Sequence, residues 1–189
     1  MTSTRPYRLG RRAERQAQTR QRIVEAAVDL HTTVGPAATS ITAIAKRAGV
    51  ERHTVYAHFS DETVLFEACS SHWTGANPFP DAAEWLEIAN PALRLRRAIG
   101  DVYAWYDGVE AALALFVRDA QVFPSWGEAR RARLAALADL LVKDLPRRKA
   151  VRAAVGHALE FETWRSLVRT QGLSNRVAAD AMARFAETL

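Results

Sequence analysis

The sequence predicts an all-α protein of about nine helices, in which a small N-terminal domain of three helices precedes a larger helical bundle. Apolar residues recur at α-helical spacing through most of the chain, and no segment shows the alternation of a β-strand. Glycine and proline interrupt the pattern at intervals that fit helical segments. The composition, 49% hydrophobic and 25% charged over 189 residues, is that of an ordinary globular chain.

The first helix is predicted from Thr19 to Val34. Its apolar residues lie at i, i+3, i+4, i+7 and i+11 and form one stripe: Ile23, Ala26, Ala27, Leu30 and Val34. Gly35-Pro36 ends this helix. Residues 1–18 are rich in arginine and hold few apolar anchors, so we expect a flexible basic arm.

Two short helices follow, as a helix-turn-helix requires. Ser40 is the expected N-cap of the first, and Gly49 supplies a left-handed residue at its end. The buried face of this helix is predicted to consist of Ile41, Ile44, Ala45 and Ala48. The next helix is expected at residues 51–57, with Val55 and Phe59 turned inward.

A fourth helix is expected to begin with Ser60 as its cap. Its inner side is predicted to hold Val64, Leu65, Ala68 and Cys69. Residues 75–81 form the best candidate linker. Further helices are predicted at 91–107, 109–120, 128–144, 147–171 and 174–187. The expected organisation is a flexible basic arm at 1–18, a helix-turn-helix domain at 19–70 and an effector-binding and dimerisation domain at 71–189.

The net charge of +5 is concentrated in the first third of the chain. Residues 1–59 hold ten Lys/Arg and four Asp/Glu, a net charge of +6, whereas the remainder holds 16 basic and 17 acidic residues. A phosphate backbone is the commonest partner of such a basic region. An anionic membrane is the competing partner, but a helix that lies on a membrane needs an apolar face left free for lipid.

The remaining composition favours the cytoplasm. The N-terminal residues are polar, so we expect no signal peptide, and no run approaches the ~20 apolar residues of a membrane helix. Cys69 is the only cysteine, which excludes a disulfide within the chain.

The segment Ser40–Phe59 carries the main functional prediction. Ala45 and Ala48 are small enough for close helix contact, and Gly49 permits the tight turn between the two helices. The second helix then exposes polar side chains that suit base edges and phosphate oxygens: Arg52, His53, Thr54, Tyr56 and His58. A helix of this kind fits the major groove of DNA.

The same segment resembles the DNA-binding domain of TetR-like (tetracycline-repressor-like) regulators. The resemblance rests on Ile44-Ala45, Ala48-Gly49-Val50, Thr54-Val55-Tyr56 and His58-Phe59, and it covers about residues 19–70. It implies a DNA-facing surface made of Thr42, Lys46, Arg52, His53, Thr54, Tyr56 and His58. Arg11 and Arg12 of the arm are expected to reach the backbone or the minor groove.

One position departs from the family pattern. The family often has a lysine at the start of the fourth helix to contact a phosphate, whereas this chain has Glu62. Unless Glu62 turns away, its negative charge repels the phosphate that the lysine would contact. The arginines of the arm are then expected to compensate for the lost phosphate contact.

The second domain is rich in aromatic residues, and any single ring is more simply explained as part of a bundle core. Clusters such as Trp105-Tyr106-Asp107 combine large rings with polar groups, which favours a ligand pocket. The resemblance implies a small-molecule effector. Its predicted contacts are Tyr103, Trp105, Tyr106, Phe116, Arg118, Trp126, Phe161 and Trp164.

The last helices predict a homodimer, because they are apolar over more than one face. The resemblance implies an interface of four helices, two from each subunit. The predicted interface residues are Val151, Val155, Leu159, Glu162, Val177, Ala181 and Phe185. A two-fold dimer places two recognition helices about 34–36 Å apart, or a multiple of that distance, on a near-palindromic operator.

The resulting prediction is a ligand-responsive transcription regulator, a repressor that an effector releases from its operator, with no cofactor or metal. A helical adaptor that binds an acidic protein remains an alternative. An enzyme is the less favoured alternative, because the chain lacks Gly-x-Ser-x-Gly, His-Glu-x-x-His and Gly-rich phosphate-loop motifs. His53 and His58, five residues apart, fall on different faces of a helix and make a poor metal pair.

Overall fold

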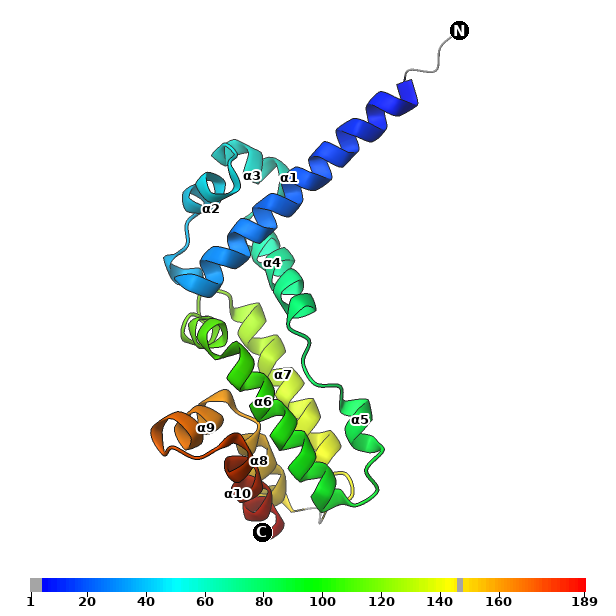
Figure 1. Ribbon diagram of the computed structural model, residues 1–189, viewed down its shortest axis with the longest axis vertical. Helices are drawn as coiled ribbons and strands as arrows, with labels where there is room; N and C mark the ends of the chain where they lie inside the picture. The colour runs from blue at the N-terminus through cyan, green and yellow to red at the C-terminus, as the bar shows by residue number, and fades with distance from the viewer. Residues whose placement is uncertain (1–4, 146–147) are drawn as a thin grey trace. The chain divides into compact units, whose positions relative to one another are not determined.

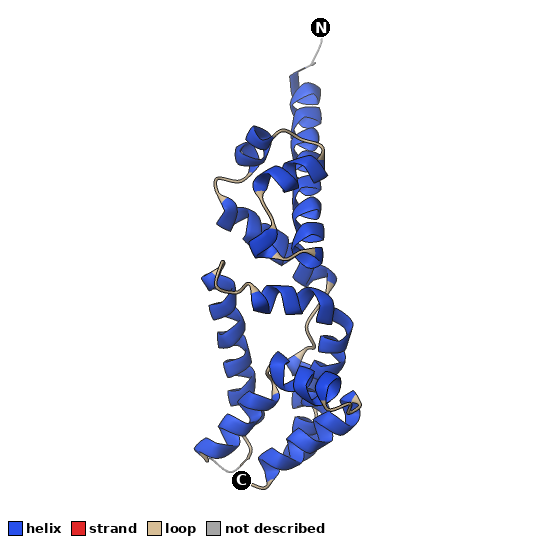
Figure 2. Cartoon of the chain, turned by 90° about the vertical axis from the view of Figure 1, so that its left-hand side faces the viewer, coloured by secondary structure: helices blue, strands red, loops and turns tan. Residues whose placement is uncertain are grey.

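The computed structural model describes residues 5–145 and 148–189. Within these ranges the chain forms ten α-helices with short 3-10 and π-helical segments and no strand (Figure 2). It divides into two compact units, one formed by residues up to Pro78 together with Ala111–Phe123, the other by Phe79–Glu110 and Pro124–Leu189. None of the helices in the described ranges has the length and apolar character needed to cross a bilayer.

The first unit is built on a long helix that carries the helix-turn-helix (Figure 1). Its elements are α1 (Arg5–Thr33), a 3-10 turn (Pro36–Ala38), α2 (Ile41–Ala48), α3 (Arg52–His58) and α4 (Glu62–Ala76). Helix α1 contacts α2, α3 and α4.

Helix α1 extends well beyond the start at Thr19 that was expected, and it includes the residues predicted to form a flexible arm from Arg5 onward. Arginine, alanine, glutamine and glutamate, which are good helix formers, make up residues 11–18. Because adding a residue to an existing helix is easier than starting one, the packed half of α1 supports its extension.

Local capping explains the boundaries of the helix-turn-helix. As predicted, Ser40 caps α2, and its Oγ accepts a hydrogen bond from the Ala43 N–H at 3.2 Å. Gly49 ends α2 at φ 65° and ψ 43°, the left-handed conformation that glycine adopts without strain. The cap of α4 is Asp61 rather than Ser60, because the Asp61 carboxylate accepts the Val64 N–H at 2.9 Å.

The core of the first unit joins α1 to the following three helices. It includes Ile23, Val24, Ala27, Ile41, Ile44, Ala45, Ala48, Val55, Phe59, Leu65, Phe66 and Cys69. Val64, expected on the inner side of α4, is 38% exposed, because the helix turns Leu65, Phe66 and Cys69 inward instead. Phe66 stacks on Phe123 with ring centroids 3.8 Å apart, which ties α4 to residues 111–123.

A clamp formed by Arg118 and Asp119 fixes the chain between α1 and α2. The buried Asp119 carboxylate accepts the Ala37 N–H at 3.0 Å and two hydrogen bonds from Arg118, while Arg118 Nη2 donates to the Val34 carbonyl at 3.1 Å. The hydrogen bond from Arg118, followed by that from Ala37, lowers the pKa of Asp119. Gly35 passes through this clamp at φ +99°.

The second unit holds the remaining helices. They are α5 (Ala82–Leu86), α6 (Pro91–Arg118, whose residues up to Glu110 belong here), α7 (Pro124–Leu141), α8 (Lys149–Ala158), α9 (Phe161–Arg165), a π-helical segment (Ser166–Thr170) and α10 (Asn175–Glu187). The sequence predicted two helices across α6, but Gly108 does not interrupt it, and a single glycine costs a helix only about 1 kcal/mol relative to alanine. The sequence also placed the start of α7 at residue 128, whereas Pro124 is its first residue, a position that tolerates proline.

The predicted helix at 147–171 is divided after Ala158 by contacts with α6. Tyr103 donates its hydroxyl hydrogen to the Ala158 carbonyl at 2.9 Å, and Tyr106 donates to the Leu159 carbonyl at 2.7 Å. These hydroxyls satisfy carbonyls at the end of α8, so the chain can leave the helix without burying unpaired polar groups.

The buried His31 makes the stability of the first unit depend on pH. Burial lowers the pKa of His31 from 6.5 to about 4, and its Nδ1 lies 3.1 Å from the Sγ of buried Cys69. Between pH 6.5 and 4 the unfolded chain binds a proton that the folded chain does not. The free energy of unfolding should therefore fall by roughly 3 kcal/mol as the pH decreases through this window.

Urea denaturation of the protein at several pH values gives the free energy of unfolding and measures this loss. His31→Leu should flatten the pH dependence in this window, and His72→Gln, at an exposed position of α4, should leave it unchanged. The same pH dependence in His31→Leu as in the wild type would contradict the assignment to His31.

The clamp leaves little room for a side chain at Gly35. A Cβ at Gly35 would lie 2.3 Å from Arg118 Nη2 and 2.6 Å from Asp119 Oδ2, at a φ that other residues rarely adopt. Gly35→Ala should lower the free energy of unfolding by about 1–3 kcal/mol. Gly75→Ala in α4, where nothing lies within 4 Å of the added Cβ, is the matched control and should not be destabilised. Equal free energies of unfolding for Gly35→Ala and Gly75→Ala would show that Arg118 and Asp119 move away from the added Cβ with little loss of stability.

Candidate nucleic-acid interface

The helix-turn-helix separates its polar and apolar side chains onto opposite faces. On α3, Arg52, His53 and Tyr56 are exposed, whereas Val55 is buried. Thr54 and His58, also predicted to face DNA, are half-buried. The outer face of α3 therefore offers a guanidinium, an imidazole and a phenol, with the chemistry that base edges and phosphates require.

Helix α2 adds two exposed residues to this face. Thr42 and Lys46 are four residues apart, so they lie one above the other on the same side of the helix. The four residues predicted to be its inner face, Ile41, Ile44, Ala45 and Ala48, are all buried. The exposed polar groups are consequently held on a helix whose orientation is fixed by packing.

Arg52 is already oriented by neighbouring groups. Its Nη2 donates to the Tyr56 hydroxyl at 3.4 Å, and its guanidinium lies 5.6 Å from the Tyr56 ring centroid. The hydrogen bond with Tyr56 is the main cause that raises the pKa of Arg52, and the charge of Glu62 contributes in the same direction. Glu62, the departure from the family pattern, is exposed and close enough to Arg52 to stabilise its positive charge.

Two contacts with α1 hold this pair of helices. Arg20 places its guanidinium 4.4 Å from the ring centroid of Phe59, the buried residue that follows α3. Arg47 of α2 pairs with Asp29 of α1 at 2.8 Å. The position of the exposed face is thus set relative to α1.

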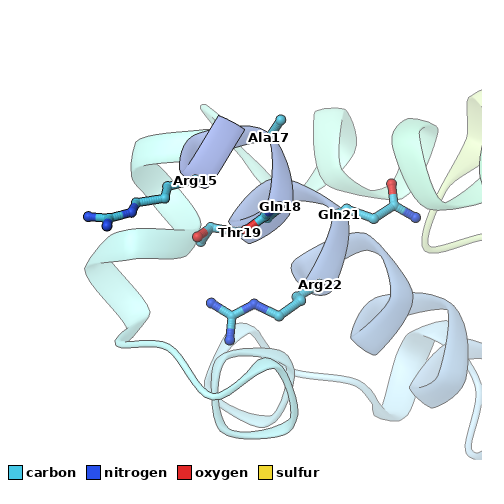
Figure 3. A pocket seen from close by; sticks show the side chains of 6 residues that line it. All are labelled: Arg15, Ala17, Gln18, Thr19, Gln21 and Arg22. Atoms are coloured by element: carbon cyan, nitrogen blue, oxygen red, sulfur yellow. The ribbon is translucent and has the colours of Figure 1, made fainter. Parts of the chain in front are cut away.

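Helix α1 brings further basic residues to the first unit. Arg11 and Arg12 are exposed, and they lie on a helix rather than a flexible arm. An open hollow is lined by Arg15, Ala17, Gln18, Thr19, Gln21 and Arg22, and the side chains of Arg15, Thr19 and Arg22 project to one side of it (Figure 3). Neither Thr19 nor Arg22 was predicted to face DNA. Their i, i+4, i+7 spacing with Arg15 becomes visible only when α1 is continued through Arg15.

The predicted effector residues are divided between the two units, and four of those in the second unit, Trp105, Tyr106, Phe161 and Trp164, are in ring contact with one another. Phe116 and Arg118 belong to the first unit and the other six to the second. Phe116 packs against Phe66, and Arg118 is held by Asp119 and the Val34 carbonyl.

The six in the second unit differ in exposure. Four are completely buried, namely Tyr103, Tyr106, Phe161 and Trp164. The indole of Trp164 donates to the Asn175 side chain at 2.9 Å, so its polar atom is satisfied inside the fold. Trp105 and Trp126 are the two that remain half-exposed.

The predicted dimerisation residues also divide into two groups. Val151, Val155 and Leu159 are buried within their own unit, because their stripe of α8 faces inward. Glu162 is exposed. On α10, Val177, Ala181 and Phe185 are exposed at i, i+4 and i+8, and Phe185 retains 49% of its accessible surface. Among the predicted dimerisation residues, only the group on α10 and Glu162 are therefore exposed.

His, Cys, Asp and Glu side chains do not assemble into a metal site in the parts of the chain that the structure describes, where no three of them come together. The principal candidate site among the described residues is therefore the set of exposed polar and basic side chains on α1, α2 and α3 of the first unit.

Comparison with known proteins supports this location. Residues 23–69 match the family model described as "Bacterial regulatory proteins, tetR family". The chain is 42% identical over 59 residues to the HTH-type transcriptional regulator AcrR of Shigella flexneri. This aligned segment spans 31% of the chain and only 27% of the length of that relative.

Solved structures resemble the chain over most of its length. A TetR-like transcriptional regulator from Rhodococcus sp. RHA1 has a TM-score of 0.64 at 24% identity, over 89% of this chain and 93% of that one. The regulator FadR of Bacillus subtilis, solved in complex with stearoyl-CoA, has a TM-score of 0.56 at 16% identity, over 89% and 97%. Because both sequence identities are below 25%, the likeness shows only that these proteins share a fold with the chain. The family match itself is confined to residues 23–69, which form a domain like that of the tetR family of bacterial regulatory proteins.

Proposed function

We propose that this protein is a transcription regulator that inserts α3 into the major groove of an operator. The observation that carries the proposal is the separation of faces in the helix-turn-helix, which lies within residues 23–69. Its apolar side chains are buried, while Thr42, Lys46, Arg52, His53 and Tyr56 are exposed. The half-buried Thr54 and His58 adjoin this face, as phosphate contacts. Arg11 and Arg12 add positive charge, and the protein acts where the DNA is, in the cytoplasm.

The regulator works as a homodimer. The exposed stripe of Val177, Ala181 and Phe185 on α10 supports this, because contiguous apolar residues at the surface mark protein contacts. A two-fold axis repeats the same face on both subunits and presents two copies of α3 to a near-palindromic operator.

A small-molecule effector regulates DNA binding. FadR of Bacillus subtilis, which shares the fold, was solved with stearoyl-CoA, and the half-exposed rings of Trp105 and Trp126 are the best placed of the predicted contacts. The effector releases the operator only if it binds more tightly to the arrangement that does not fit DNA. Repression relieved by the effector is the mode that we propose.

Selection of bound sequences from random DNA at a fixed salt concentration tests the proposed function. Two related half-sites, with centres separated by 10–10.5 base pairs or a multiple of that spacing, are the expected outcome. Recovery of no common sequence would contradict it, and an acidic protein partner for the basic face would then be preferred.

Arg52 is expected to contribute to the recognition of a single base pair. Arg52→Ala should weaken binding to the selected duplex by about 1–3 kcal/mol, with loss of selectivity at one base pair if the guanidinium reads a guanine. Fluorescence anisotropy with duplexes substituted at each position measures this. Arg131→Ala, which removes an exposed arginine from α7, is the control. A uniform loss over all sequences would make Arg52 a phosphate contact instead.

Phe185 provides a prediction about assembly. Phe185→Glu places a charge on the largest side chain of the α10 stripe, at its C-terminal end, and should shift the protein from dimer to monomer in analytical ultracentrifugation. Val122→Glu, at an exposed valine of the first unit, should leave the dimer intact. An unchanged mass for Phe185→Glu would remove α10 from the interface.

A further inference from the structure

The basic face of α1 is continuous with the helix-turn-helix. At 100° per residue, Arg11, Arg15 and Arg22 fall within an arc of about 40°, and Thr19 lies about 40° beyond Arg15. From Arg11 to Arg22 this face extends over about 17 Å. One strand of B-DNA presents about five phosphates over that axial length.

Its inner end lies beside the turn of the helix-turn-helix. The Nη1 atom of Arg22 is 4.0 Å from the position that a Cβ on Gly49 would occupy. From there the face runs along α1 towards its N-terminal end, beyond the part of α1 beside α2 and α3 (Figure 1). Arg22 is therefore the member of this face that lies beside the helix-turn-helix, and Arg15 and Arg11 follow along α1 away from it.

The hollow on this face has the chemistry of a phosphate site. Arg15 and Arg22 project to the same side of α1, with the Thr19 hydroxyl between them (Figure 3). Two guanidiniums can donate paired hydrogen bonds to phosphate oxygens, and a hydroxyl adds one more donor. The hollow is open to solvent, so a phosphate and its sugar neighbours can reach these side chains.

Internal carboxylates do not neutralise this part of the face. Within residues 5–145 and 148–189, no ion pair involves Arg15 or Arg22, although many other arginines, including Arg47, Arg94 and Arg152, are paired with an aspartate. The exposed residues of α1 from 11 to 22 are Arg, Glu, Gln and Ala, so no large apolar side chain is available for a lipid surface. These features favour a nucleic-acid backbone over a membrane.

We propose that the α1 face, defined by Arg11, Arg15, Thr19 and Arg22, is a second DNA-binding surface that holds the phosphate backbone outside the half-site contacted by α3. This inference rests on the proposed function. The surface contributes affinity that is independent of base sequence and lengthens the stretch of duplex that the protein covers. It is a rigid helical track along the backbone, rather than a flexible arm in the minor groove.

The test uses the full-length chain with two duplexes: the motif selected from random DNA, and the same motif extended by about one helical turn on each side. Dissociation constants are measured for each from low to moderate salt. The wild type should bind the extended duplex more tightly and with a steeper salt dependence. Arg15→Gln/Arg22→Gln should reduce that slope by about 2 on the extended duplex and leave the short duplex nearly unaffected.

Two controls separate this result from general effects. Arg131→Gln/Arg176→Gln removes the same charge from exposed positions of the second unit and should retain the dependence on duplex length. The melting temperature of Arg15→Gln/Arg22→Gln should equal that of the wild type, since both side chains are exposed.

Three results would overturn the inference. If the wild type binds its motif selectively but the slope on the extended duplex is the same in Arg15→Gln/Arg22→Gln, the α1 face has another partner, such as an acidic protein. If the variant loses equal affinity on both duplexes, the contact lies within the half-site. If the wild type shows no selective binding to either duplex, the proposed function fails together with this inference.

Discussion

The hydrogen bond from the Ala37 N–H to Asp119 is the contact on which the arrangement of the first unit depends. It joins the turn that leads into the helix-turn-helix to a residue more than 80 positions later in the chain. A buried carboxylate is costly unless it is paired, and Arg118 supplies the charge while also binding the Val34 carbonyl. Glycine suits position 35 because its φ is +99° and a Cβ there would lie 2.3 Å from Arg118 Nη2 and 2.6 Å from Asp119 Oδ2. The DNA-binding unit therefore includes residues 111–123 as a structural part.

The pair of helices that faces DNA could be predicted because its signals are local. The Ser40 cap, the left-handed Gly49 and the inward Val55 each act within a few residues, and each is where the sequence indicated. The all-α fold followed from periodicity in the same way. Local signals could not predict the length of α1. Residues Arg5–Gln18 become helical only as an extension of the later part of α1, which packs against the other helices.

The second unit was harder to predict because its boundaries depend on tertiary contacts. The end of α8 is stabilised by hydroxyls of Tyr103 and Tyr106, which are more than 50 residues away in sequence. Periodicity identified the stripe containing Val151 and Val155 correctly as apolar, but it could not say whether that stripe faces its own unit or another chain. Arg118 was predicted to contact an effector, but its side chain is bound within the fold. Its partners are Asp119 and a backbone carbonyl.

The candidate interface follows from these constraints. Packing of α2 and α3 on α1 leaves Arg52, His53 and Tyr56 exposed beside a helix whose arginines continue the same positive surface. Base-reading groups supply selectivity, whereas charges that meet phosphates supply affinity that depends on salt. Selectivity is therefore the property that distinguishes a regulator from a merely basic protein.

The ratio of two dissociation constants measures that property most directly. They are the constants of the full chain for the selected duplex and for a scrambled duplex of equal length and composition, determined at physiological salt. The account predicts at least about a 10³-fold preference for the selected sequence. A ratio near one, with both constants at about 10⁻⁴–10⁻⁶ M, would contradict it.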